Sequence, residues 1–287
     1  MQWHDIRDPQ DPELDRLAER YNLHPLHIED CRHRNQNAKI EEGHGYVFTV
    51  LKPVSLDNGS IVVCDVDLFL GPDYLITVIE GDSPPVRHLL NSVCPDPKSP
   101  RADQAYYRVV DGVVDLYLPV LDHYAESIDE LEDLVLEDPT PALLARIFET
   151  KRNLILLRRV LVNTRDVANH LQRSESGLIQ RDMWPFLRDI YDHVARNLDT
   201  VEMLRDLLTG SLDVYLSSVA NRTNQVMKVL TVLGTVALPM LVLSSFWGMN
   251  LKDLPLVDSP HATLIVTGLM AASTAALLIV LRFFRWL

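Results

Sequence analysis

The longest apolar runs of the chain lie toward its C-terminal end. Residues 229–247 read VLTVLGTVALPMLVLSSFW and residues 261–281 read HATLIVTGLMAASTAALLIVL, and neither run contains Asp, Glu, Lys or Arg. A helix of about 20 apolar residues crosses a hydrocarbon layer of about 30 Å, whereas a helix of a soluble protein usually carries a polar stripe. The pattern therefore predicts two transmembrane helices, joined by the loop 248–260.

Ahead of the spans, the pattern predicts an α/β head followed by helices. Segments rich in β-branched and aromatic residues, typical of strands, are 45–53, 61–70 and 74–80. The turn sequence at 57–59 predicts a hairpin between the first two of these strands. Helical segments, two of them with Asp11 and Pro141 at their starts, are predicted over 12–22, 85–93, 104–137 and 141–175.

One continuous helix is predicted from residue 184 to residue 247. Its prolines are Pro185, in the first turn, and Pro239, inside the first span, where a membrane helix tolerates proline. At a rise of ~1.5 Å per residue such a helix is nearly 100 Å long. A helix of this length predicts a bundle or an oligomeric funnel.

Acidic residues repeat every seven positions along this helix, at Asp192, Asp199, Asp206 and Asp213. Seven residues are almost two full turns, so the four carboxylates share one face. The same line continues into the span through the apolar or small residues Met227, Gly234 and Leu241. Around a symmetry axis the line would form acidic rings below an apolar throat, which is typical of a cation pathway. The alternative is a solvated outer face of a stalk helix.

The chain has a net charge of −13, and the acidic residues are concentrated ahead of the spans. This balance argues against nucleic-acid binding, which requires Lys and Arg to neutralise phosphates. Basic residues flank the spans on one side: Arg222 and Lys228 precede the first, and Arg282 and Arg285 follow the second. Because Lys and Arg stay on the cytoplasmic side, both termini are predicted to be cytoplasmic.

The patterns divide the chain into an α+β cytoplasmic domain, a long stalk helix and two transmembrane helices. The predicted parts are a head over 1–100, a helical part of the funnel over 101–182, the stalk helix over 183–247 with the first span at about 229–247, an external loop over 248–260, the second span over 261–281 and a tail over 282–287. No nucleophile–base set or phosphate-binding loop is apparent, so we expect neither an enzyme nor a bound cofactor.

Directly after the first span stand Gly248, Met249 and Asn250. A Gly-Met-Asn sequence at the outer end of the first of two C-terminal spans resembles the CorA family of magnesium channels. The resemblance extends back through FLRDIYDH (186–193) and LDVYLSSVANRTNQVMKVLT (212–231), and more weakly over the rest of the chain.

The resemblance implies a homopentamer in a lipid bilayer, with an αβα cytoplasmic funnel and, we expect, a place in a bacterial inner membrane. It implies that Gly248, Met249 and Asn250 form a selectivity filter for a divalent cation, most simply Mg²⁺. By matching motif positions, it implies that Asn224, Met227, Leu230 and Leu238 face the pore, to which the heptad line adds Gly234 and Leu241.

The resemblance also implies a regulatory metal site between subunits, with Asp189 as one ligand. The family's matching acid is absent from the segment 83–86 (SPPV), where Pro84 takes its place, although Asp82 lies close by. A divalent ion prefers several oxygen ligands, so we expect only weak inhibition by Mg²⁺. The usual glutamate after the filter is also missing, since residues 254–257 read LPLV.

Two other functions fit the same sequence. Zinc-transporting relatives share the implied fold and filter, so Zn²⁺, Co²⁺ or Ni²⁺ is an alternative cargo. A protein of another class would be a membrane-anchored regulator that conducts nothing. Such an anchor has no need of Asn250 or of the acidic line, and ion flux distinguishes the two.

Overall fold

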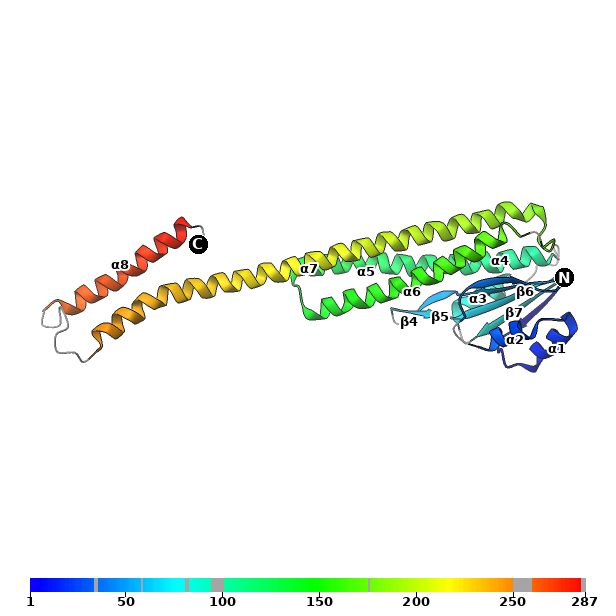
Figure 1. The fold of residues 1–287 in the computed structure, drawn as a ribbon, viewed down its shortest axis with the longest axis horizontal. Helices are drawn as coiled ribbons and strands as arrows, with labels where there is room; N and C mark the ends of the chain where they lie inside the picture. The colour runs from blue at the N-terminus through cyan, green and yellow to red at the C-terminus, as the bar shows by residue number, and fades with distance from the viewer. Residues whose placement is uncertain are drawn as a thin grey trace. The chain divides into compact units, whose positions relative to one another are not determined.

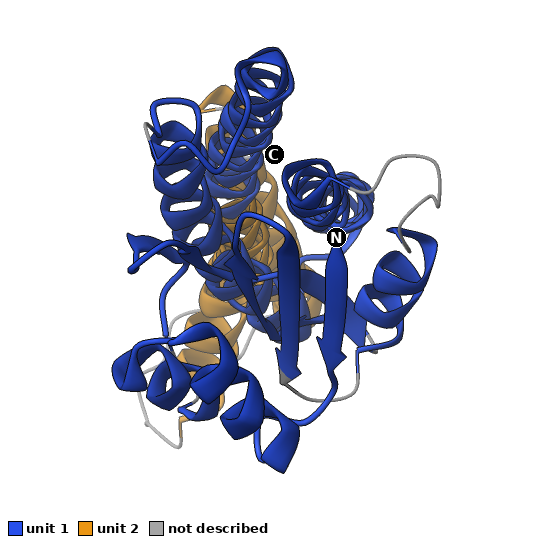
Figure 2. Cartoon of the chain, turned by 90° about the vertical axis from the view of Figure 1, so that its right-hand side faces the viewer, with its two compact units in different colours: residues 1–214 blue, residues 215–287 orange. Residues whose placement is uncertain are grey.

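The computed structural model describes residues 1–33, 36–57, 59–80, 83–93, 101–174, 176–249 and 260–284. It forms two compact units, residues 1–214 and residues 215–287 (Figure 2). A mixed α/β region comes first, helices follow, and two apolar helical segments lie near the C-terminal end (Figure 1). The predicted fold class is therefore confirmed.

A five-stranded sheet forms the centre of the first unit. Its spatial order is β1 (Gln2–Ile6), β7 (Tyr74–Glu80), β6 (Asp65–Leu70), β3 (Val47–Leu51) and β2 (Lys39–Glu42). β1 and β7 are parallel, and the other neighbours are antiparallel. The two outer strands, QWHDI and KIEE, were not predicted from the sequence. Both are partly exposed edge strands rich in polar residues, so they lack the apolar signal of a central strand.

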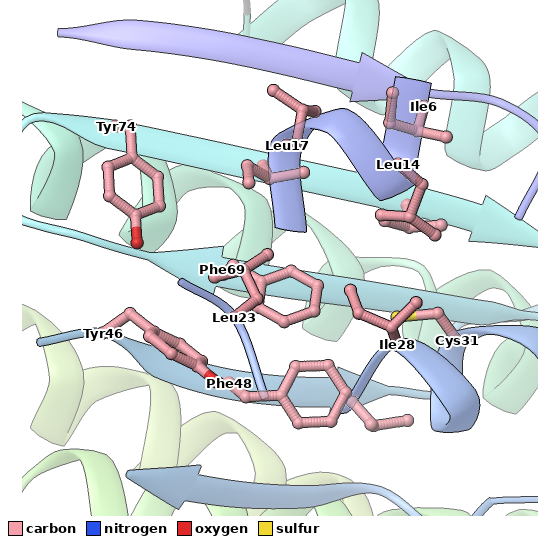
Figure 3. Close-up of a cluster of buried hydrophobic side chains, with 13 residues drawn as sticks. Ile6, Leu14, Leu17, Leu23, Ile28, Cys31, Tyr46, Phe48, Phe69 and Tyr74 are labelled. Carbon is pink, nitrogen blue, oxygen red and sulfur yellow. The ribbon is translucent and has the colours of Figure 1, made fainter. Parts of the chain in front are cut away.

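Helices cover both faces of this sheet, as the αβα expectation requires. On one face, α1 (Pro12–Tyr21) and α2 (Pro25–Arg32) place apolar side chains against Phe48 and Phe69 of the central strands (Figure 3). On the other face, the Tyr106 hydroxyl of α4 (Ala102–Asp115) lies 2.7 Å from Oγ1 of Thr49 on β3. Because both faces are covered, β3 and β6 are buried along their whole length.

An acidic group is buried within the first of these interfaces. Asp67 on β6 is 3 % exposed, and its burial, reinforced by the charge of Asp65, raises the pKa of its carboxyl to about 7. Since this pKa lies above the value of 3.8 for an exposed Asp, folding favours the protonated form. The stability that Asp67 contributes is therefore present at low pH and is lost as the pH rises toward 7.

This linkage predicts the behaviour of an Asp67→Asn variant, which is neutral at every pH. Melting temperatures of both proteins, measured from pH 5 to pH 8, should show wild type losing stability relative to the variant as the pH rises. A constant difference between the two melting temperatures across this range would contradict the assignment of Asp67 as the titrating group.

The predicted hairpin between residues 45–53 and 61–70 is correct in pairing and wrong in detail. β3 does pair with β6 in antiparallel fashion, but a separate two-stranded ribbon is inserted between them, formed by β4 (Val54–Asp57) and β5 (Ser60–Val63). Asp57 at the end of β4 pairs with Ser60 at the start of β5, and the predicted turn residue Asn58 lies outside the described residues. Val54 to Val63 leave the sheet because Lys52 and Pro53 end β3, and Pro53 has no N–H to continue the ladder.

The helix predicted over 104–137 is two helices, α4 (Ala102–Asp115) and α5 (Tyr117–Glu137), separated at Leu116. Pro119 explains the break, since it lacks an N–H and its ring clashes with the carbonyl four residues earlier. The remaining predicted helices are present, as α3 (Pro84–Val93) and α6 (Pro141–Leu171). The Thr140 side chain caps α6 by accepting a hydrogen bond from the Leu143 N–H.

The long helix is present as predicted. α7 (Trp184–Trp247) is 64 residues long and contains Pro239 in its interior, and a short 3₁₀ helix (Arg181–Met183) precedes it. α8 (Ala262–Phe283) matches the second predicted span to within two residues. Both helices contain stretches long and apolar enough to cross a membrane, and these stretches are almost wholly unburied within the chain.

Candidate ion pathway and metal site

The first half of α7 has two opposite faces. Its buried side chains alternate at spacings of three and four residues and are Leu187, Ile190, Val194, Asn197, Val201, Leu204, Leu208 and Ser211. This is the heptad pattern of a packed helical seam. The four aspartates of the acidic line are all exposed. At 100° per residue they lie about 180° from the seam.

The acidic line is therefore one exposed face, as the spacing predicts. Its carboxylates belong to Asp192, Asp199, Asp206 and Asp213, and none of them forms an ion pair with the described residues. The carboxylates recur about every second turn, and Arg196 is the exposed basic residue that lies between Asp192 and Asp199 on nearly the same face. Such a row attracts mobile cations from solution.

The six positions predicted to face a pore are all exposed within the single chain. They are Asn224, Met227, Leu230, Gly234, Leu238 and Leu241. Other side chains of the same segment, such as Val226 and Leu233, are equally exposed. Exposure in one chain does not distinguish the six predicted positions from their neighbours, so the pore face of α7 stays a prediction. It does establish that this segment of α7 is left uncovered by the described residues of its own chain.

Several hydroxyl groups in the apolar segments donate to carbonyls of their own helix. Oγ1 of Thr231 donates to the Met227 carbonyl at 2.8 Å, and Oγ1 of Thr274 donates to the Met270 carbonyl at 2.9 Å. A hydroxyl bonded to the carbonyl of the preceding turn exposes no unmet donor. This hydrogen bond reduces the free-energy cost of placing the hydroxyl in hydrocarbon. Both segments are therefore compatible with a bilayer.

The predicted filter begins where α7 ends. The Gly248 N–H donates to the Ser244 carbonyl at 2.9 Å, which closes the last turn. A Cβ added to Gly248 would lie 3.0 Å from that same carbonyl oxygen, so a larger residue would strain the turn. Met249 follows and is exposed. Asn250, the third filter residue, lies outside the described residues.

Three side chains of the first unit form a candidate metal site. Asp111 and Asp115 lie one turn apart on α4, and His193 faces them from α7. One possible ligand atom from each of the three lies within 4.8 Å of the others. Asp189, one turn before His193, places a carboxylate oxygen 3.6 Å from Nε2 of that imidazole. Two carboxylates and an imidazole are ligands for a divalent metal ion.

Burial and mutual repulsion disfavour the charged forms of the carboxyl groups in this cluster. Burial, followed by the charge of Asp115, raises the pKa of the Asp111 carboxyl, while a hydrogen bond with Tyr107 opposes the shift. Burial and Asp111 together raise the pKa of Tyr107 to about 12. The carboxylates therefore repel one another in the absence of a cation, and a bound divalent ion would relieve this repulsion.

Sequence reasoning missed most of this cluster. It singled out Asp189 and noted that His193 lies one turn further along, which the structure confirms as an ion-pair geometry. Asp111 and Asp115 have the i, i+4 spacing of one helix face, and this was the available signal. The other predicted ligand, Asp82, lies outside the described residues, and Pro84 begins α3.

His24 and His27 of the head have structural roles. Nδ1 of His24 caps α2 by accepting from the Leu26 N–H at 3.2 Å. His27 is buried, with one ring nitrogen 2.8 Å from the Tyr46 hydroxyl and the other 2.9 Å from Glu41. The His24 imidazole therefore caps a helix, and the His27 imidazole is hydrogen-bonded through both of its ring nitrogens.

The sequence was compared with protein families and with known proteins. The family described as CorA-like Mg²⁺ transporter protein matches residues 1–282. The cobalt/magnesium transport protein CorA of Thermotoga maritima is 34 % identical over 279 residues, which cover 96 % of this chain and 80 % of that protein.

Solved structures share the fold at lower identity. The complete CorA magnesium transporter of Methanocaldococcus jannaschii has a TM-score of 0.85 and 22 % identity, and the match covers 99 % of this chain and 91 % of that one. Full-length CmaX has a TM-score of 0.79 and 20 % identity, with 99 % and 88 % of the two chains covered.

Proposed function

Because the chain belongs to the CorA-like family of Mg²⁺ transporter proteins, which are membrane transporters of metal ions and not enzymes, we propose that it is a Mg²⁺ channel. In this proposal five copies surround one pore, in a bacterial inner membrane with both termini in the cytoplasm. The observation that carries it is the acidic face of α7, which lies opposite the packed seam and ends at Asp213, ahead of the apolar segment of the same helix.

The ion enters through the filter of Gly248, Met249 and Asn250. Mg²⁺ gives up its coordinated water reluctantly, so a ring of amide and carbonyl oxygens that binds those waters is a suitable entrance. Asn is neutral, so the ion is not held too strongly to leave. Inside-negative potential supplies about 4.6 kcal/mol per 100 mV for a divalent ion, which is twice the value for one charge.

Below the filter, the ion passes the apolar stretch of α7 and reaches the acidic line. The stretch contains Leu238 and Leu230, and apolar constrictions close to ions by losing water. The carboxylates of Asp213 to Asp192 then draw the cation toward the cytoplasmic end. A face that is already exposed and unpaired requires no rearrangement of the chain's own core to line this path.

Ion flux into liposomes, measured with Mg²⁺, Co²⁺, Ni²⁺ and Zn²⁺ in parallel, tests the proposal. Mg²⁺ should enter fastest under an inside-negative potential, and the purified complex should have the mass of five chains in mild detergent. Faster entry of Zn²⁺, Co²⁺ or Ni²⁺ would identify a transition metal as the cargo. No flux from an assembled complex would favour the non-conducting regulator.

We also propose that Asp111, Asp115 and His193 bind a divalent cation within one chain. Imidazole is a better ligand for Co²⁺ than for Mg²⁺, so the cluster should prefer Co²⁺. The His193→Ala variant should lose roughly tenfold or more in Co²⁺ affinity and change little in Mg²⁺ affinity. Titration calorimetry on the full chain measures both. Equal losses for the two ions would contradict the role of His193 as a ligand.

Inhibition by internal Mg²⁺ should be weak in this protein. Asp189 has lost its matching acid to Pro84, and Mg²⁺ gains little from one carboxylate. We expect millimolar Mg²⁺ loaded inside liposomes to slow influx only slightly, and Asp189→Ala to change the inhibition curve little. Steep inhibition that disappears in Asp189→Ala would show that Asp189 still anchors a regulatory site.

A further inference from the structure

A cavity of about 920 Å³ lies in the first unit, and it shares no lining residue with the acidic line or the metal cluster. It is bounded by the end of β3, the β4–β5 ribbon, the start of α3 and the middle of α6. Its volume is within the range of small-molecule binding sites. None of its lining residues has a part in the ion pathway proposed above.

The inner wall of the cavity is polar and buried. Lys52 and Asp65, which are 9 % and 8 % exposed, form an ion pair there. Ser83 is 5 % exposed and lies beside the Cys64 thiol, yet its Oγ has no partner in hydrogen-bond geometry among the described residues. Buried polar groups are nearly always hydrogen-bonded. The inner wall therefore combines a neutralised ion pair with a buried hydroxyl beside the Cys64 thiol.

The outer wall carries an unpaired positive charge. Arg159 and Asn163 lie one turn apart on α6 and both line the cavity. Arg159 is exposed, and no carboxylate partner occurs for it in the described ranges. By contrast, three other arginines of α6 do have a described carboxylate partner, namely Arg146, Arg158 and Arg165. In a chain of net charge −13, an unpaired guanidinium over a cavity is a local site for an anion.

The other residues that line the cavity restrict the kind of ligand it can bind. Val62, Leu156 and Val160 supply an apolar wall, and Asp57 supplies an acceptor for hydroxyl or amino groups. Pro84 and Pro85 occupy the first turn of α3 and have no N–H to offer an anion. Arg159 is therefore the main donor for an oxyanion, since a guanidinium binds carboxylate or phosphate through two parallel hydrogen bonds.

We propose that this cavity binds an organic oxyanion of about mononucleotide size. Its phosphate or carboxylate group lies on Arg159 and Asn163, its apolar body contacts the α6 side of the cavity, and its hydroxyl or amino groups face Asp57. A cytoplasmic anion of this class would give the transporter a ligand other than its cargo.

Cys64 provides the measurement, because it is half-buried and lines the cavity. Alkylation of Cys64 in the full chain, followed at pH 8.5 by mass spectrometry of its peptide, reports occupancy. AMP, citrate and inorganic phosphate are the probes. AMP or citrate should slow alkylation of Cys64, and inorganic phosphate should do so less, because it lacks an organic body. Protection by AMP alone identifies a phosphate ester, and protection by citrate alone identifies a carboxylate.

Arg159→Gln should weaken that protection roughly tenfold or more. Arg152→Gln is the matched control, since Arg152 is an exposed arginine of the same helix outside the cavity lining. Both positions are exposed, so neither variant should impair folding. Absence of protection by every probe at millimolar concentration, or equal protection in Arg159→Gln and wild type, would overturn the proposal.

Discussion

Asn250→Ala is expected to abolish divalent cation uptake while the complex still assembles. Asn250 supplies the amide oxygen of the proposed filter, and Ala leaves a methyl group where the waters of a hydrated ion would be bound. The residue lies in the loop between the spans, so its loss should not disturb the packing of membrane helices. Flux into liposomes, with the mass of the complex measured in the same preparation, gives both parts of the result.

Lys252→Ala is a suitable control for this experiment. It changes a side chain of the same loop two residues away, and it removes a positive charge that opposes cation entry. Uptake by this variant should be at least that of wild type. Normal uptake through an assembled Asn250→Ala complex would show that the filter is built from other residues.

Lys52→Met is expected to destabilise the head severely. The substitution leaves Asp65 buried without its cation, and Asp67 lies buried on the same strand. Removing one partner of a buried ion pair costs about 3–5 kcal/mol. In a unit of this size that loss lowers the melting temperature by roughly 6–20 °C. Thermal unfolding of the full chain in detergent, followed by circular dichroism, measures the change.

Two further variants make the Lys52 result specific. Arg152→Met removes an exposed cation of α6 and should leave the melting temperature nearly unchanged. Lys52→Met combined with Asp65→Leu removes both charges, and it should recover much of the lost stability. If Lys52→Met melts like wild type, the charge of Lys52 does not stabilise the folded head.

Features encoded locally were predictable from the sequence. The two spans follow from uninterrupted apolar runs, and α7 follows from the lack of a helix-breaking residue between Pro185 and Pro239. The common face of the acidic line follows from its spacing alone. These features depend on helix geometry, which one segment of sequence determines by itself.

Features that depend on tertiary packing were not predictable in the same way. The edge strands β1 and β2 are strands because β7 and β3 offer free hydrogen-bonding edges, and their own residues are mostly polar. Asp115 and His193 are distant in sequence and meet only because α4 lies beside α7. The break between α4 and α5 was also not predicted, although Pro119 was a local signal for it.

The two opposite faces of α7 restrict how this helix can change in evolution. A single inserted residue in the stalk would rotate everything beyond it by 100° relative to the preceding seam. The acids beyond the insertion would then turn toward the bundle, and apolar seam residues such as Leu204 or Leu208 would turn toward water. Insertions or deletions of seven residues keep both faces in register. Homologous stalks of different length should therefore differ by whole heptads.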